Sequence, residues 1–168
     1  MALALMLAAT LAACGDDGGT NVKPKPVDPT ENLSTGIHPV LIASDPGPTT
    51  SYITLQLRPV RIEARIAGYQ GELTYDPATL ELTGAEFPSG VEGAWNLASP
   101  GVVRFAGTAL EGVDAQGTVL LLRYIRKGTV TDQAFTVSVA ELVGNASLDD
   151  LLPLYVSRDH PLLVESDN

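Results

Sequence analysis

From Tyr52 onward, apolar and polar side chains alternate with a period of two residues, and no other feature constrains the fold of this chain as tightly. In 53–58 every second residue is apolar, and the same spacing returns in 61–66, where it is clearest. Because successive side chains of a β-strand point to opposite faces, such runs place one side on a core and the other in solvent. We therefore predict strands over both runs.

Turn-forming residues divide the alternating region into short pieces. Gly, Pro, Asn and Asp recur in clusters roughly every eight to fourteen residues, which is typical of sandwiches and barrels. Ser99-Pro100-Gly101 predicts a hairpin between 93–98 and 101–107. Helical character is confined to one short turn over 146–151. The pattern therefore predicts an all-β sandwich or barrel.

The first thirteen residues are almost wholly apolar and end in Leu11-Ala12-Ala13, followed by Cys14. This arrangement resembles a bacterial lipoprotein signal peptide, in which the peptidase cuts before the cysteine and the thiol carries a diacylglycerol. No Lys or Arg precedes the run, which departs from the usual pattern. The resemblance implies a lipid anchor at Cys14 in the membrane of the cell envelope, and Gly15 after it favours the outer membrane, facing the periplasm or the cell surface. A buried or free structural thiol is the alternative.

Residues 14–50 are rich in Gly, Pro, Asp, Thr and Lys, a composition that favours an extended tether over a packed core. Within this stretch, 38–43 is apolar and is either an edge strand or a segment docked on the domain. We place the folded domain at 51–165. With 45% hydrophobic residues the chain has enough apolar material for one core.

The formal net charge is −10, from 20 acidic and 10 basic residues. Phosphate backbones would be repelled by this charge, so nucleic acid is not an expected partner.

No residues are arranged for catalysis, and we predict no enzyme, cofactor or metal site. The two histidines, His38 and His160, lie far apart without further metal-ligand residues spaced near them. The acidic pair Asp149-Asp150 lacks the flanking ligands of a calcium loop. No P-loop, dinucleotide-binding or nucleophile-elbow motif occurs.

A strand ending in Tyr75-Asp76-Pro77, then a short turn and the Leu-Glu-Leu run of 80–82, resembles the cohesin modules of cellulosome scaffolding proteins. The segments 101–105 and 117–124, where a Gly precedes a strand that ends in an aromatic residue, resemble the same family. The resemblance covers about 51–143. In physical terms the motif closes a turn, because Asp76 can accept backbone hydrogen bonds and Pro77 stops the strand.

The resemblance implies a jelly-roll β-sandwich of about nine strands that docks a partner protein, a dockerin module or another envelope protein, on one flat sheet face. The alternation assigns seven residues to the core: Leu73, Tyr75, Val103, Phe105, Leu120, Leu122 and Tyr124. By parity and family likeness, eight residues then form the partner-binding face: Gln70, Glu72, Thr74, Asn96, Arg104, Val119, Leu121 and Arg123. Val119 and Leu121 would make an apolar patch there, unless other layers cover them or the parity is shifted.

A carbohydrate-binding module of the same sandwich class is the alternative, with polysaccharide as the ligand. Tyr69 and Trp95 are the candidates for stacking on sugar rings, although aromatic residues make up only 5% of the chain.

Overall fold

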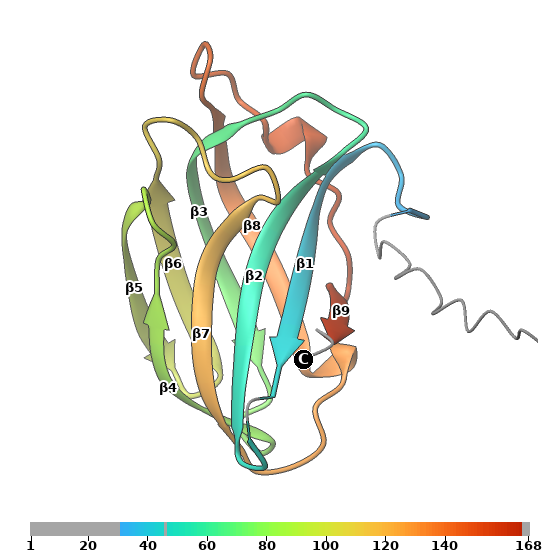
Figure 1. Cartoon of the computed structure of the whole chain (residues 1–168), viewed down its shortest axis with the longest axis vertical. Coiled ribbons are helices and arrows are strands. Elements are labelled where there is room, and N and C mark those ends of the chain that lie inside the picture. The colour runs from blue at the N-terminus through green and yellow to red at the C-terminus, as the bar shows by residue number, and fades with distance from the viewer. Residues whose placement is uncertain (1–30, 46, 166–168) are drawn as a thin grey trace, which may run out of the picture.

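The computed structural model describes residues 31–45 and 47–165, which form a two-layered β-sandwich (Figure 1). The strands are β1 (Gly36–Ser44), β2 (Thr50–Val60), β3 (Ile66–Tyr75), β4 (Leu80–Glu86), β5 (Glu92–Ser99), β6 (Val102–Thr108), β7 (Thr118–Arg126), β8 (Phe135–Gly144) and β9 (Leu162–Glu165). The expected signal peptide, 1–13, and the expected lipidation site, Cys14, lie outside the described residues.

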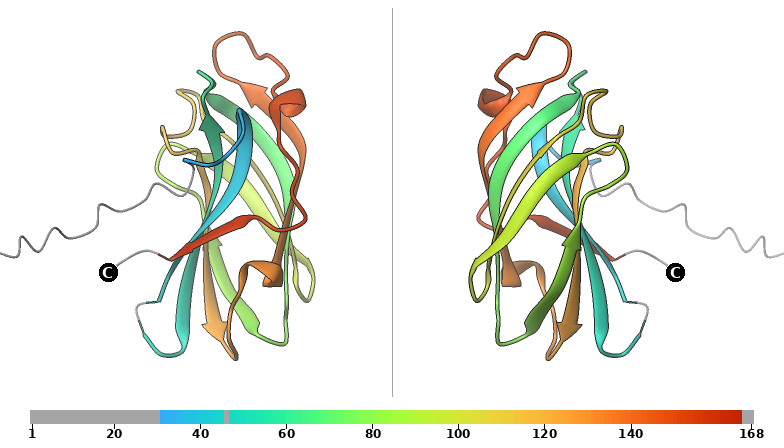
Figure 2. Two further views of the ribbon diagram at one scale, coloured as in Figure 1. Left: turned by 90° about the vertical axis from the view of Figure 1, so that its right-hand side faces the viewer. Right: turned by 90° about the vertical axis from the view of Figure 1, so that its left-hand side faces the viewer.

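One sheet has the strand order β4-β7-β2-β1-β9 and the other β5-β6-β3-β8. All pairings are antiparallel except that of β1 with β9. Figure 2 shows the two layers after a quarter turn of the molecule. The nine strands confirm the jelly-roll β-sandwich predicted from the sequence.

The core lies between the sheets, and all seven residues assigned to it by the alternation are buried. Its centre is aromatic: the ring of Tyr124 contacts those of Tyr75 and Phe135 edge-on, with centroids 5.1 and 6.5 Å apart. The hairpin around Pro100 also forms as predicted, because Gly101 adopts a φ of +84° that suits the turn.

The folded domain begins earlier than the sequence indicated. Residues 36–44, which we had placed in the tether as an edge strand or docked segment, form β1 inside a sheet, between β2 and β9. Ile37, Val40 and Leu41 are fully buried there. The strand was missed because the prolines around it give residues 14–50 the composition of a linker, although the residues of 38–43 are apolar.

The strand predicted over 61–66 does not form. β2 ends at Val60 and β3 begins at Ile66, and the residues between them pair with no strand. Arg61 has a φ of +54°, which turns the chain out of the extended conformation. Ile62 and Ala64 still pack against the core, so the period of two reflects burial without strand pairing.

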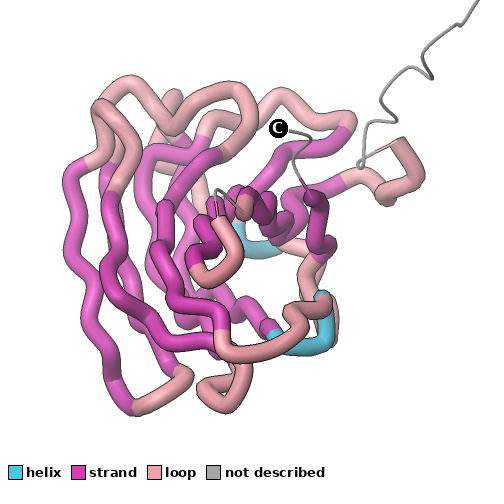
Figure 3. Tube along the Cα trace, turned by 60° about the horizontal axis from the view of Figure 1, so that its bottom comes forward, coloured by secondary structure: helices cyan, strands magenta, loops and turns pink. Residues whose placement is uncertain are grey.

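Among the described residues, helical structure is limited to two short 3₁₀ turns, Asp132–Ala134 and Leu152–Leu154 (Figure 3). The helical turn expected over 146–151 is instead a loop, and the 3₁₀ turn Leu152–Leu154 follows it. Leu148 has a φ of +55° in this loop.

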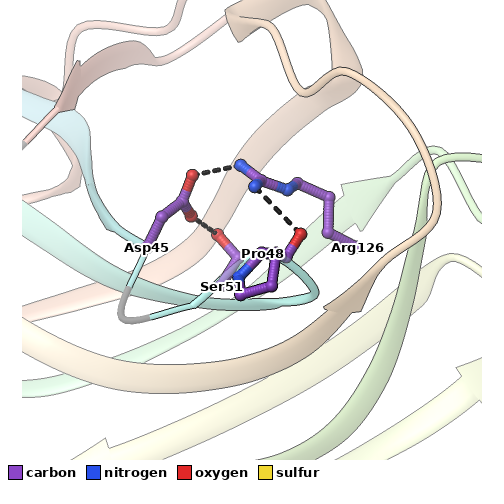
Figure 4. A network of polar contacts seen from close by, with 4 residues as sticks. All are labelled: Asp45, Pro48, Ser51 and Arg126. Carbon is purple, nitrogen blue, oxygen red and sulfur yellow. Dashed lines mark hydrogen bonds and ion pairs between the residues drawn. The ribbon is translucent and has the colours of Figure 1, made fainter.

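The loop between β1 and β2 is held by a polar network (Figure 4). Asp45 accepts hydrogen bonds from the Ser51 hydroxyl, at 2.7 Å, and from the guanidinium of Arg126 on β7. The same guanidinium donates to the carbonyl oxygen of Pro48 at 3.2 Å. These contacts fix the loop to the end of the neighbouring strand.

Candidate partner-binding face

The outer face of the sheet β5-β6-β3-β8 brings together five of the eight residues predicted for partner binding. Strand register aligns Asn96, Arg104 and Glu72 in one row across β5, β6 and β3. Gln70 lies in the next row, and Thr74 lies at the far end, where its hydroxyl is hydrogen-bonded to that of Thr136 on β8. We call this surface the hollowed face.

The hollowed face contains an open depression of about 500 Å³. Small side chains, Ala94, Ala106 and Ala140, leave room at its floor, while the polar residues of the first row stand around it. A second depression of about 620 Å³ lies beside the first on the same face. It is lined by Thr108, Glu141 and the exposed side chains of Leu110 and Leu148. The face therefore offers a long, shallow surface that suits a docked molecule better than an enclosed substrate.

The charges on the hollowed face are few and accessible to solvent. The Arg104 guanidinium pairs with the Glu72 carboxylate at 3.1 Å, and the Arg104 side chain is 67% exposed. Glu92 and Glu141 add negative charge at the second depression. Because exposed ion pairs are worth little to stability, Arg104 and Glu72 are free to exchange their partners for those of a bound molecule.

The remaining three predicted residues do not lie on this face, because β7 belongs to the other sheet. Leu121 and Arg123 are exposed on the outside of that sheet, across the sandwich from Arg104. β8 takes the place that we had given to β7, and it contributes Ser138 and Ala140. In 135–139, Phe, Val and Val alternate with Thr and Ser, which indicates the parity of β8 but not its neighbours in the sheet.

Val119 is fully buried, contrary to the prediction. The pairing of β2 with β7 shifts register between Leu55 and Gln56, which oppose Leu120 and Thr118, so Val119 is the extra residue of a β-bulge. The bulge breaks the period of two, and Val119 and Leu120 are both buried. The apolar patch expected from Val119 and Leu121 does not exist.

The turn motif is structural, as its chemistry suggested. Tyr75 is buried in the core. The Asp76 carboxylate accepts a hydrogen bond from the amide of Ala78 at 2.9 Å, and its carbonyl oxygen accepts one from the amide of Leu80 at 3.1 Å. Pro77 packs near Gly101 of the facing hairpin.

The two candidates for sugar stacking do not form a platform. Tyr69 is 3% exposed, and its hydroxyl donates to the carbonyl oxygen of Val119 at 2.6 Å. Burial raises the pKa of Tyr69 above its ordinary value. Trp95 is 37% exposed, but it pairs with the core residue Phe105, so its side chain points to the inner side of the sheet rather than onto the hollowed face.

The two histidines lie apart in the structure. His38 is fully buried on β1, where its Nε2 donates to the carbonyl oxygen of Ser34 at 2.8 Å and its Nδ1 has no partner among the described residues. Burial lowers the pKa of His38 below its usual 6.5, and the nearby Arg158 adds to this effect. His160 lies at the chain's C-terminal segment, with its Nδ1 3.1 Å from the carbonyl oxygen of Phe135. The described part of the chain holds no group of three metal-ligating side chains.

Within residues 31–45 and 47–165, no helix is long and apolar enough to cross a bilayer.

The fold and the hollowed face are those of a jelly-roll β-sandwich module. Comparison with solved structures shows which modules of this kind share the fold. The chain has the fold of cohesin modules. The sixth cohesin of scaffoldin B from Acetivibrio cellulolyticus, solved with a Cel5 dockerin, superposes with a TM-score of 0.52 at 14% identity, over 71% of this chain and 95% of that one. The cohesin CaCohA2 from Clostridium acetobutylicum gives 0.53 at 11% identity, over 79% and 92%. No protein-family model and no curated protein matches the sequence. The cohesin resemblance is thus confirmed as a likeness of fold.

Proposed function

We propose that this domain is a non-catalytic binding module that docks a partner protein of the dockerin type, or another envelope protein, on its hollowed face. The observation that carries the proposal is the pair of depressions end to end on one face, of which the first is floored by small side chains and flanked by Arg104, Glu72 and Asn96. The cohesin fold supports it, because a cohesin of the same fold was solved in complex with a dockerin.

Filling the depression tests this proposal. Ala106→Trp places a large side chain on the exposed floor of the first depression, and Leu121→Trp is its matched control on the opposite sheet. The wild-type domain would be immobilised, proteins of the envelope fraction captured and identified, and the affinity of the purified partner measured by calorimetry. We expect Ala106→Trp to weaken binding at least ten-fold and Leu121→Trp to leave it unchanged. Full binding by a correctly folded Ala106→Trp would refute the docking site.

Polysaccharide binding on the same face is the second candidate. The polar groups of Gln70, Asn96 and Arg104 around the first depression can hydrogen-bond to sugar hydroxyls. Its weakness is that neither Tyr69 nor Trp95 offers a ring to the face. Affinity electrophoresis in soluble polysaccharides separates the candidates: retardation that Ala106→Trp abolishes would favour sugar binding over protein docking.

The anchor remains a proposal drawn from the sequence. We infer that Cys14 is lipidated and holds the domain at the cell envelope, on the outer membrane, through the Pro-rich segment that precedes the first described residues. Metabolic labelling with an alkyne fatty acid in a bacterial host provides the test. The wild-type chain should carry the label and sediment with membranes, whereas Cys14→Ser should lose both properties. An unlabelled wild-type chain would rule out the anchor.

A further inference from the structure

Each of the two sheets has two outer strands, and three of these four edges are short, charged or covered. On β8, the carbonyl oxygens of Val137 and Leu142 accept hydrogen bonds from the Tyr155 hydroxyl, at 3.0 Å, and from the amide of Leu151, at 2.8 Å. β9 is four residues long. β4 carries two acids, Glu81 and Glu86. Protection of this kind prevents unwanted strand pairing.

β5 is neither short nor covered, and its one irregularity is a β-bulge at Ala98, where Leu97 and Ser99 oppose Val103 and Val102 of β6. All eight of its residues are exposed, and it contains neither Lys nor Pro. Its only charged residue is Glu92, at its first position. Among the described residues, the backbone of 93–99 is hydrogen-bonded only to β6. A long edge with free amides and carbonyls is a template for one more strand.

Apolar side chains accompany this open edge. Trp95 and Leu97 pair with the core residues Phe105 and Val103, so they point to the inner side of the sheet. Yet Trp95 is 37% exposed and Leu97 48%, and β5 is the outermost strand of its sheet (Figure 1). An added strand would cover both side chains.

We propose that β5 pairs antiparallel with β5 of a second copy of this chain, about a two-fold axis at Asn96. Only registers that oppose inner residues to inner residues are compatible with two continuous sheet faces. With Asn96 opposite Asn96, Trp95 lies opposite Leu97 of the second copy, and Ala94 faces the bulged position Ala98. No charged residue opposes another, so the strand is complementary to itself.

The second copy is favoured over a foreign strand because one β5 supplies both halves of the apolar contact. The pairing makes one eight-stranded sheet. The two-fold axis is perpendicular to that sheet, so both hollowed faces point to the same side. If the proposed function holds, a dimer would bind two partner modules side by side. A contact of one strand pair is smaller than the about 1,200 Å² of a stable interface, so the dimer is expected to dissociate on dilution.

Cross-linking tests the register. In a chain carrying Cys14→Ser, the variant Asn96→Cys should form a disulfide-linked dimer under mild oxidation, because opposed Cβ atoms lie about 4.5–5.5 Å apart. Ala94→Cys, on the same face, is the matched control: it faces the bulged position Ala98, about 13 Å along the strand from its own copy, and should stay monomeric. Equal cross-linking of both variants, or of neither, would overturn the proposal.

Sedimentation equilibrium tests the unlinked protein. The wild-type chain should show a reversible dimer, and Leu97→Lys should weaken it at least ten-fold by placing a charge on the inner side of the edge. Leu121→Lys, equally accessible on the other sheet, should leave dimerisation unchanged. A wild-type chain that is monomeric at millimolar concentration would refute the pairing. Pairing of β5 with a strand of another protein, in place of a second copy, would refute it as well. Partner docking is scored separately, because Leu97→Lys leaves the hollowed face intact.

Discussion

Tyr69 links the two sheets through a single hydroxyl group. Its ring fits because position 107 is a glycine, where a Cβ atom would lie 2.5 Å from the Tyr69 hydroxyl oxygen. The hydroxyl then satisfies the carbonyl oxygen of Val119, which the β-bulge leaves buried inside the sandwich. A tyrosine in an alternating run indicates a strand, but the role of Tyr69 depends on a glycine and on a bulge in distant segments, which sequence reasoning cannot bring together.

Removing that hydroxyl should cost about 1 kcal/mol in the free energy of unfolding, because Tyr69→Phe leaves a buried carbonyl oxygen without its donor. Urea denaturation measures the change. Tyr52→Phe, at a tyrosine that is 44% exposed, should leave the urea midpoint unchanged. An equal effect of the two substitutions would contradict the inter-sheet role of Tyr69.

His38 should make stability depend on pH. Its pKa is lowered in the folded state, so the unfolded chain takes up the proton first as the pH falls. The stability that neutral His38 provides is therefore fully present above pH 6.5 and is lost as the pH falls below it, by at most about 1.4 kcal/mol per pH unit. The urea midpoint at pH 7.5 and at pH 5.0 gives the measurement. The difference between the two should shrink in His38→Gln and persist in His160→Gln.

At the scale of the strand, β7 shows where a period of two stops being reliable. The parity of Leu120, Leu122 and Tyr124 was predicted correctly, yet one step earlier the bulge buries Val119 as well. A bulge inserts a residue that no alternation can reveal. The same limit applies to 61–65, where apolar spacing persists without a strand.

The same substitution should therefore affect stability very differently at Val119 and at Leu121. Val119→Glu buries an unpaired charge and should destabilise the fold by about 3–5 kcal/mol. Leu121→Glu, at a position 37% exposed, should change stability by less than about 0.5 kcal/mol. Thermal melting followed by circular dichroism distinguishes the two. Similar melting temperatures would contradict the bulge.

At the scale of the whole molecule, local patterns predicted the sandwich and its core but not which strands are neighbours. The face of Gln70, Glu72, Thr74, Asn96 and Arg104 was predicted from parity together with the resemblance to cohesin modules, and of its pairings only that of β5 with β6 is a local hairpin. Its fourth strand was missed, because the alternation in β7 and β8 does not indicate which sheet each strand joins. Long-range topology is set by how the two layers close, and alternation carries no information about it.

The boundary of the domain gives a direct test at this scale. A chain that begins at Glu31 should fold with unchanged stability. A chain that begins at Ser51 lacks β1, and thus the strand against which Leu55 and Leu57 pair. It should be unfolded or aggregated, as judged by circular dichroism and gel filtration. A folded chain beginning at Ser51 would mean that β1 is dispensable.

The parallel pairing of β1 with β9 decides how the domain bears mechanical load. Val40 to Ala43 lie beside Leu162 to Glu165, and the two strands run in the same direction. The first residue of β1 and the last residue of β9 therefore lie at opposite ends of the strand pair. Tension between residues 36 and 165 would pull the two strands past each other in shear and strain their hydrogen bonds together, instead of opening them one by one as in a zipper. A module held at its first strand could thus resist pulling at its last.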